Sequence, residues 1–99
     1  KICHTKTDLP RALKEADVIC SAAGAPGLID AQWLRRGATL VDISTNWREN
    51  RLCGDANPAE LEKCGISYSP VPGGVGPVTL AVLLENIILS GERKLKENV

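Results

Sequence analysis

Phenylalanine and methionine are absent from the sequence, and its only aromatic residues are Trp33, Trp47 and Tyr68. A core without these side chains has to be aliphatic, and valine, isoleucine and leucine occur here in short runs. Short aliphatic runs are typical of parallel strands that are covered on both faces. We therefore expect a parallel sheet rather than a half-exposed antiparallel one.

The chain also lacks an excess of either charge, since 12 lysine and arginine residues balance 12 aspartate and glutamate residues. Such a chain has no net field that attracts nucleic acid, an anionic membrane or a strongly charged protein. Its longest largely apolar stretch, Val78–Leu84, is far shorter than the roughly 20 residues that span a bilayer, and no charged-then-apolar leader opens the chain. We expect a soluble protein with neither a nucleic-acid partner nor a membrane partner.

The cysteines form no C-x-x-C pair and have no metal-type spacing with the only histidine, His4. This pattern favours free, mostly buried thiols over disulfides or a zinc site. Free thiols are typical of a reducing compartment, so we expect the cytoplasm or an organelle such as the mitochondrial matrix. The four residues are Cys3, Cys20, Cys53 and Cys64.

Strand-like and helix-like segments alternate along the chain. Aliphatic runs predict the strands, and helical spacing with Thr7 and Asp30 as caps predicts the first two helices. The predicted strands are residues 1–5, 17–24, 38–44 and 65–69, and the predicted helices are residues 8–16, 31–36, 58–64 and 77–96, with a polar, turn-rich segment at 46–57. This alternation calls for a Rossmann-like α/β fold with a parallel sheet, closed by a long C-terminal helix.

A dinucleotide-binding fold of this kind begins with a strand that leads into G-x-G-x-x-G, and no such turn precedes Lys1. We therefore expect residues 1–99 to be the latter part of an NAD(P)-binding domain without its first βα unit. At this length the chain can build one small core at most.

Ligands of open α/β sheets bind where loops leave the carboxyl ends of the strands. In the first such loop, His4, Thr5 and Lys6 occupy the place that meets the adenosine ribose, and none of them is acidic. An acid there selects NAD, whereas a hydroxyl or a base accepts the 2′-phosphate of NADP. The loop favours NADP, with NAD as the alternative, and an ordinary polar loop fits the spacing equally well.

The loop before the last helix is the most unusual segment. Pro72 and Pro77 stiffen its ends, while Gly73, Gly74 and Gly76 allow backbone angles or close approaches that other residues do not. Together with the free N–H groups of the following helix, this loop could hold a ring, a carbonyl or an anion. A stiff surface turn without a ligand is the alternative.

The stretch SPVPGGVGPVTLAVLLEN, at 69–86, resembles the C-terminal signature of the methylenetetrahydrofolate dehydrogenase/cyclohydrolase family, in which P-G-G-V-G-P-M-T opens the last long helix. CHTKT at 3–7 and ADVICSAAGAPGLI at 16–29 resemble further family blocks in the same order. RRGATLVDISTN at 35–46 and GDANP at 54–58 continue the series. The resemblance therefore covers essentially the whole chain.

The resemblance implies a bifunctional enzyme of one-carbon folate metabolism that uses NADP and is commonly a homodimer. It implies that the catalytic lysine and the N-terminal catalytic domain lie upstream of Lys1, so that this chain holds no catalytic residue and is inactive alone. It places Thr5 near the adenosine 2′-phosphate and Thr45 against the cofactor. The implied folate-binding residues are Pro72, Gly73, Gly74, Val75 and Gly76.

The chain departs from the family pattern at two places. Ile43, Ser44 and Thr45 replace the usual V-G-I and add a Cβ atom and hydroxyls beside the expected nicotinamide, and Val78 replaces the usual methionine. The alternative is therefore a diverged, non-catalytic paralogue that serves as a dimerisation or scaffold module of a larger folate protein. A Rossmann-type binder unrelated to folate fits the alternation but not the glycine-proline loop.

Overall fold

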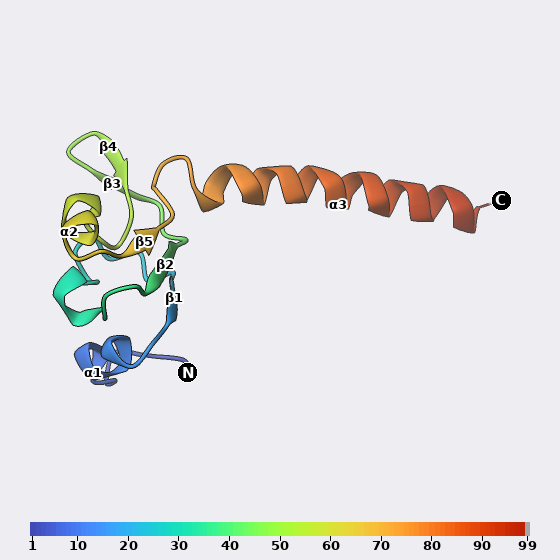
Figure 1. Ribbon diagram of the computed structural model, residues 1–99. Helices are drawn as coiled ribbons and strands as arrows, with labels where there is room; N and C mark the ends of the chain where they lie inside the picture. The colour runs from blue at the N-terminus through green and yellow to red at the C-terminus, as the bar shows by residue number, and fades with distance from the viewer. Residues whose placement is uncertain (99) are drawn as a thin grey trace.

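A computed structural model of the chain describes residues 1–98 (Figure 1). Its helices and strands, in chain order, are α1 (Leu9–Lys14), β1 (Val18–Ser21), the 3₁₀ helix η1 (Ala31–Trp33), β2 (Thr39–Asp42), β3 (Asn46–Arg48), β4 (Arg51–Cys53), α2 (Pro58–Lys63), β5 (Ser67–Tyr68) and α3 (Val75–Glu97). Helical and extended segments alternate as the sequence predicts, except at the first strand and between β2 and α2.

The central sheet consists of β1, β2 and β5, in that order and all parallel. Val18 pairs with Thr39, and Thr39 pairs on its other side with Ser67. Because parallel neighbours need a crossover connection, the chain passes through η1 between the first two strands and through a hairpin and α2 before the third. The predicted α/β class with a parallel sheet is confirmed.

The expected first strand at 1–5 does not form. These residues have no strand partner in the described part of the chain, and Ile2 is 93% exposed. The predicted cap is also wrong, because the Thr7 hydroxyl accepts a bond from the His4 N–H, at 2.9 Å. Asp8 caps α1 instead, and its carboxylate accepts a bond from the Arg11 N–H.

An antiparallel hairpin of β3 and β4 occupies the segment predicted only as polar and turn-rich. Its two turn residues, Glu49 and Asn50, have φ values of 51° and 60°. Two successive positive φ values are typical of the type I′ turn, which usually carries Asn-Gly or Asp-Gly. Because Glu-Asn is not one of these pairs, the two turn residues do not predict a hairpin from the sequence.

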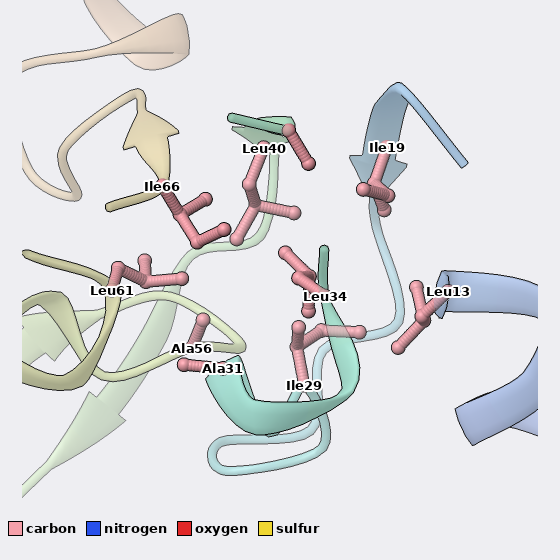
Figure 2. Packing of buried hydrophobic residues seen from close by; sticks show 10 residues of the cluster. Leu13, Ile19, Ile29, Ala31, Leu34, Leu40, Ala56, Leu61 and Ile66 are labelled. Atoms are coloured by element: carbon pink, nitrogen blue, oxygen red, sulfur yellow. The ribbon is translucent and has the colours of Figure 1, made fainter. Parts of the chain in front are cut away.

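The hydrophobic core lies on one face of the sheet, between the strands and α1, η1 and α2 (Figure 2). Leu40 is completely buried at its centre. The buried residues are Leu13, Ile19, Ile29, Ala31, Leu34, Ala38, Leu40, Ala56, Leu61 and Ile66. Coverage of both faces was expected, but Val18 and Cys20 on the opposite face of β1 are exposed. Side chains alternate along a strand, and no described element covers that second face.

The last helix, α3, projects away from the sheet and buries none of its residues (Figure 1). The radius of gyration is consequently 17.2 Å, against about 13 Å for a compact domain of this length. The helix begins at Val75, slightly before the predicted start at 77, since proline is tolerated in the first turn. By length and composition alone, α3 could cross a membrane.

The thiols differ from the expectation in one respect. All four cysteines are free, as predicted, but none of them is fully buried. Cys3 and Cys20 are exposed because they lie on the unformed first strand and on the uncovered face of the sheet, whereas Cys53 and Cys64 are half-buried.

Candidate functional site

The turn after β2 and the proline-glycine loop before α3 meet at the carboxyl end of the sheet. Together with Leu52 of β4 they border an open cavity of about 220 Å³, which we call the loop cavity. Its lining residues are Asp42, Ile43, Ser44, Thr45, Leu52, Val71, Pro72, Gly73, Gly76 and Pro77. Thr45 and most of the loop at 72–76, which the sequence predicts to bind two different molecules, therefore border one cavity.

Each glycine of the loop has its own reason to lack a side chain. Gly73 has a φ of 97°, in the region that favours glycine. A Cβ atom at Gly74 would collide with the carbonyl oxygen of Pro70. Gly76 lines the loop cavity, and a Cβ atom there would have no neighbour within 4 Å. The backbone thus explains Gly73 and Gly74, whereas Gly76 keeps space free at the cavity.

The end of β1 and the turn after β2 are tied together by one carboxylate, that of Asp55, which is completely buried. It accepts bonds from the hydroxyls of Ser21, at 2.6 Å, and Ser44, at 2.5 Å. It also accepts the backbone N–H groups of Ala23, at 3.0 Å, and Ala25, at 2.9 Å. We call this arrangement the Asp55 clasp.

A second buried carboxylate, that of Asp42 at the end of β2, holds the clasp in place. It accepts the backbone N–H groups of Asp55, at 2.8 Å, Ala56, at 3.3 Å, and Ser44, at 3.2 Å. A Cβ atom at Gly54 would collide with this carboxylate, which explains why glycine precedes Asp55. The Asp42 side chain therefore fixes the backbone that carries Asp55.

The two carboxylates differ in their acidity. Burial opposes ionisation of Asp55, but the bonds from Ser21, Ser44 and the loop N–H groups together outweigh it and lower the pKa of this carboxyl below its ordinary value. Burial raises the pKa of Asp42, and the nearby negative charge of Asp55 adds to this effect against the backbone bonds. Asp55 is therefore the carboxylate that the fold stabilises in its charged form.

Ser44 departs from the expectation that its hydroxyl stands beside a nicotinamide. The residue borders the loop cavity, but it is only 6% exposed and its hydroxyl donates to Asp55. The same oxygen accepts the Gly24 N–H, at 3.3 Å. Its neighbours Ile43 and Thr45 are exposed. Of the two added hydroxyls, only that of Thr45 is therefore left on the accessible side.

The other predicted residues are placed as follows. Val75 is the first residue of α3, and no side chain caps that helix. Neither Val75 nor Gly74 is among the described residues that line the loop cavity. Thr5 is exposed in a turn closed by the Thr7 N–H and the His4 carbonyl, at 2.9 Å. Thr5 is not among the described residues that line the loop cavity, so its role at an adenosine 2′-phosphate stays a prediction. No metal-binding cluster occurs among residues 1–98.

Sequence reasoning missed Ser21, Asp42 and Asp55 as a functional group of residues. Polar residues at the ends of two aliphatic strands were a signal for a site at this edge. The sequence alone could not show that Asp55, 34 positions after Ser21, would lie between the two loops.

Sequence comparison identifies relatives over nearly the whole chain. The family model described as tetrahydrofolate dehydrogenase/cyclohydrolase, NAD(P)-binding domain, matches residues 1–95. The bifunctional protein FolD of Elusimicrobium minutum is 48% identical over 97 residues, which make up 96% of this chain and 34% of that protein. The bifunctional protein FolD of Methanospirillum hungatei is 49% identical over 86 residues, or 86% of this chain and 31% of that protein.

Solved structures agree with this result. The bifunctional methylenetetrahydrofolate dehydrogenase/cyclohydrolase FolD of Campylobacter jejuni superposes with a TM-score of 0.87 at 40% identity, over 95% of this chain and 34% of that one. The Trypanosoma brucei enzyme, solved in complex with NADP cofactor and an inhibitor, gives a TM-score of 0.78 at 34% identity, over 89% of this chain and 32% of that one. This chain spans about a third of the length of these relatives. It belongs to the tetrahydrofolate dehydrogenase/cyclohydrolase family and matches the NAD(P)-binding domain of that family.

Proposed function

We propose that this chain is the cofactor-binding part of a bifunctional methylenetetrahydrofolate dehydrogenase and methenyltetrahydrofolate cyclohydrolase that uses NADP. The observation that carries the proposal is the loop cavity, in which Thr45 and the proline-glycine loop border one space. The names of the relatives support the two activities, and the Trypanosoma brucei complex supports NADP over NAD.

The proposed reaction transfers a hydride from the methylene carbon of 5,10-methylenetetrahydrofolate to the nicotinamide ring of NADP. Water then adds to the methenyl carbon, and ring opening gives 10-formyltetrahydrofolate. Both organic molecules carry their own reactive atoms, so the protein mainly has to orient them and exclude competing reactions.

The loop cavity fits one end of such a complex rather than the whole of it. Its volume of about 220 Å³ is below the roughly 300–1,000 Å³ of complete ligand pockets. We therefore assign Thr45 to the cofactor and Pro72, Gly73, Gly74, Val75 and Gly76 to the folate side. Thr5 would meet the 2′-phosphate when residues 1–5 form the strand that the sequence predicts.

We assign no catalytic residue to this chain. Around the loop cavity the described residues offer backbone groups, the Thr45 hydroxyl and the Asp42 carboxylate, but no lysine or histidine. We propose that the groups that move protons belong to a catalytic domain elsewhere in the full-length protein. These 99 residues alone would then be inactive.

We further propose that protein, rather than a membrane, covers α3. The family match extends to residue 95 and so includes nearly the whole helix. Glu85, Asn86 and Glu92 interrupt its apolar residues, as in an amphipathic helix that packs on protein. A homodimer in the cytoplasm is the assembly that we propose, with the mitochondrial matrix as the alternative location and no nucleic-acid partner.

Purified full-length protein tests this function. With NADP and 5,10-methylenetetrahydrofolate, we expect NADPH to appear in the absorbance spectrum, and NADP to tighten the binding of a folate analogue in a titration. Coupled binding distinguishes a folate enzyme from an unrelated dinucleotide binder. A folded protein that binds neither molecule would instead favour the alternative, a non-catalytic dimerisation or scaffold module.

A further inference from the structure

The hydrogen-bond donors of Asp55 all come from two segments that leave the carboxyl end of the sheet. Ser21, Ala23 and Ala25 belong to the end of β1 and its exit loop. Ser44 and Asn46 belong to the turn after β2 and the start of β3, with the Asn46 amide at 3.4 Å. One buried charge therefore fixes both segments at once.

Packing of the protein interior does not by itself require a charged side chain at position 55. A buried carboxylate loses its hydration, and well-packed apolar residues often stabilise a fold equally well. Asp55 is nevertheless completely buried, and its oxygens are satisfied by donors on the two loops. Hydrogen bonds to a charged group are short and directional, so they fix loop positions more tightly than apolar contacts do.

We propose that Asp55 is a positioning residue for NADP. It sets the separation of the loop at 22–25 and the turn at 43–45, so that the cofactor meets two preformed segments. This inference rests on the proposed function. Asp55 is not among the described residues that line the loop cavity, and it acts through Ser44, which is.

The segment that carries Asp55 is itself held rigidly. Asp42 accepts the Asp55 and Ala56 N–H groups, and the Ile29 N–H donates to the Asp55 carbonyl, at 3.2 Å. The carboxylate therefore stands on backbone that is anchored to the end of β2 and to the core. Preformed loops lower the ordering cost of ligand binding, so the clasp contributes to affinity without touching the ligand.

The experiment uses the full-length protein, its Asp55→Asn variant and a Leu61→Ala control. Asparagine keeps the size but not the charge. Only its Oδ1 can accept, so it cannot serve all of the two hydroxyls and two N–H groups that donate to the Asp55 carboxylate. We expect the Kd for NADP to rise about tenfold or more, and saturating NADP to restore most of kcat. Leu61 is buried in the core, so its truncation should lower Tm but leave the Kd for NADP unchanged.

Amide hydrogen exchange gives a readout that needs no cofactor. In Asp55→Asn, exchange should rise together at Ala23 and Ala25, which donate to Asp55, and at Gly24, which donates to the Ser44 hydroxyl. Leu61→Ala should not raise it at these three amides in concert. Should Asp55→Asn fail to fold, Ser44→Ala removes one donor and should weaken NADP binding in the same direction.

The possible outcomes distinguish a failure of the positioning role of Asp55 from a failure of the proposed function. An unchanged Kd for NADP in a folded Asp55→Asn or Ser44→Ala variant overturns the positioning role and leaves the proposed function standing. Exchange that rises at Ala23 and Ala25 but not at Gly24, whose N–H donates to the Ser44 hydroxyl, also overturns it. Wild-type protein that binds no NADP overturns the proposed function, and the positioning role falls with it.

Discussion

The carboxylate of Asp55 and the hydroxyl of Ser44 lie 2.5 Å apart in the interior of the protein. By its sequence position, that hydroxyl replaces a glycine of the family pattern and should stand beside the nicotinamide. Its burial against a carboxylate means that the departure from the pattern adds a structural bond. This arrangement favours a structural role for Ser44 over a decayed cofactor site.

Replacing Ser44 and Thr45 by the glycine and isoleucine of the family pattern tests whether Ser44 has a structural role or marks a decayed cofactor site. We expect Ser44→Gly in the full-length protein to weaken NADP binding several-fold, because Asp55 loses one of its hydroxyl donors. Thr45→Ile should leave the clasp intact and change NADP binding only through contact, since Thr45 is exposed at the loop cavity. Calorimetric titration of both variants checks this, and tighter NADP binding by Ser44→Gly would speak for a decayed site.

Stability should depend on pH through Asp55. Its pKa is lowered in the folded protein, so its contribution is present above its ordinary pKa of about 4 and disappears as the pH falls through the lowered value. The pKa of Asp42 is raised in the folded protein. Its contribution to stability is therefore present at pH values below its ordinary pKa and is lost as the pH rises through the raised value. Comparing the wild type with Asp55→Asn isolates the contribution of Asp55, because Asp42 is present in both proteins.

Urea unfolding of full-length wild type and Asp55→Asn between neutral and acidic pH measures this difference. The wild type should be more stable at neutral pH, and the gap should close below about pH 4. Leu61→Ala changes no titratable group, so its gap to the wild type should not close in the same window. A pH-independent gap for Asp55→Asn would contradict the expected ionisation.

Gly74 and Gly76 form a matched pair. Gly74→Ala should destabilise the loop by about 1–3 kcal/mol, because the new methyl group would collide with the Pro70 carbonyl. Gly76→Ala should leave stability almost unchanged, since its Cβ atom would have no neighbour within 4 Å. It should nevertheless weaken folate-analogue binding, as Gly76 borders the loop cavity.

Thermal unfolding and ligand titration of both glycine variants check this pair. The expected pattern is a lowered Tm for Gly74→Ala and a weakened Kd with normal Tm for Gly76→Ala. Normal folate-analogue binding by Gly76→Ala would argue against the assignment of this loop to the folate side.

The isolated 99-residue chain should self-associate or dissolve poorly. The apolar residues of α3 are exposed, and contiguous apolar surface of this kind drives association. Replacing Leu80, Leu84 and Ile88 by glutamine should shift the isolated chain toward monomer in sedimentation, whereas the same number of glutamine substitutions at Glu85, Glu92 and Lys96 should not. A wild-type chain that stays monomeric and melts sharply would contradict this prediction.

Much of the fold can be predicted from local sequence patterns. The positions of β1, β2, β5, α2 and α3 follow from aliphatic runs, helical spacing and the glycine-proline loop. Asp30 caps η1 as predicted, and its carboxylate accepts the Gln32 N–H, at 2.9 Å. These features depend on neighbours within a few residues, and a sequence displays such neighbours directly.

Other features depend on partners that the local pattern does not contain. The strand expected at 1–5 needs a neighbouring strand, and the hairpin at 46–53 depends on positive φ values at Glu49 and Asn50. The long helix predicted at the C-terminus forms as α3, but its apolar side chains are exposed and none of the described residues buries them. In each case the sequence indicates a tendency, and packing decides whether it is realised.

Short-range periodicity predicts the parallel α/β class and, apart from residues 1–5 and the β3–β4 hairpin, the order of the elements, while blocks of matching residues identify the family. The inward turn of Ser44, the bridge that Asp55 forms between two loops and the cavity shared by Thr45 and the proline-glycine loop are visible only in the folded protein. These contacts join residues 11 to 34 positions apart, so they exist only when the sheet brings the ends of its strands together.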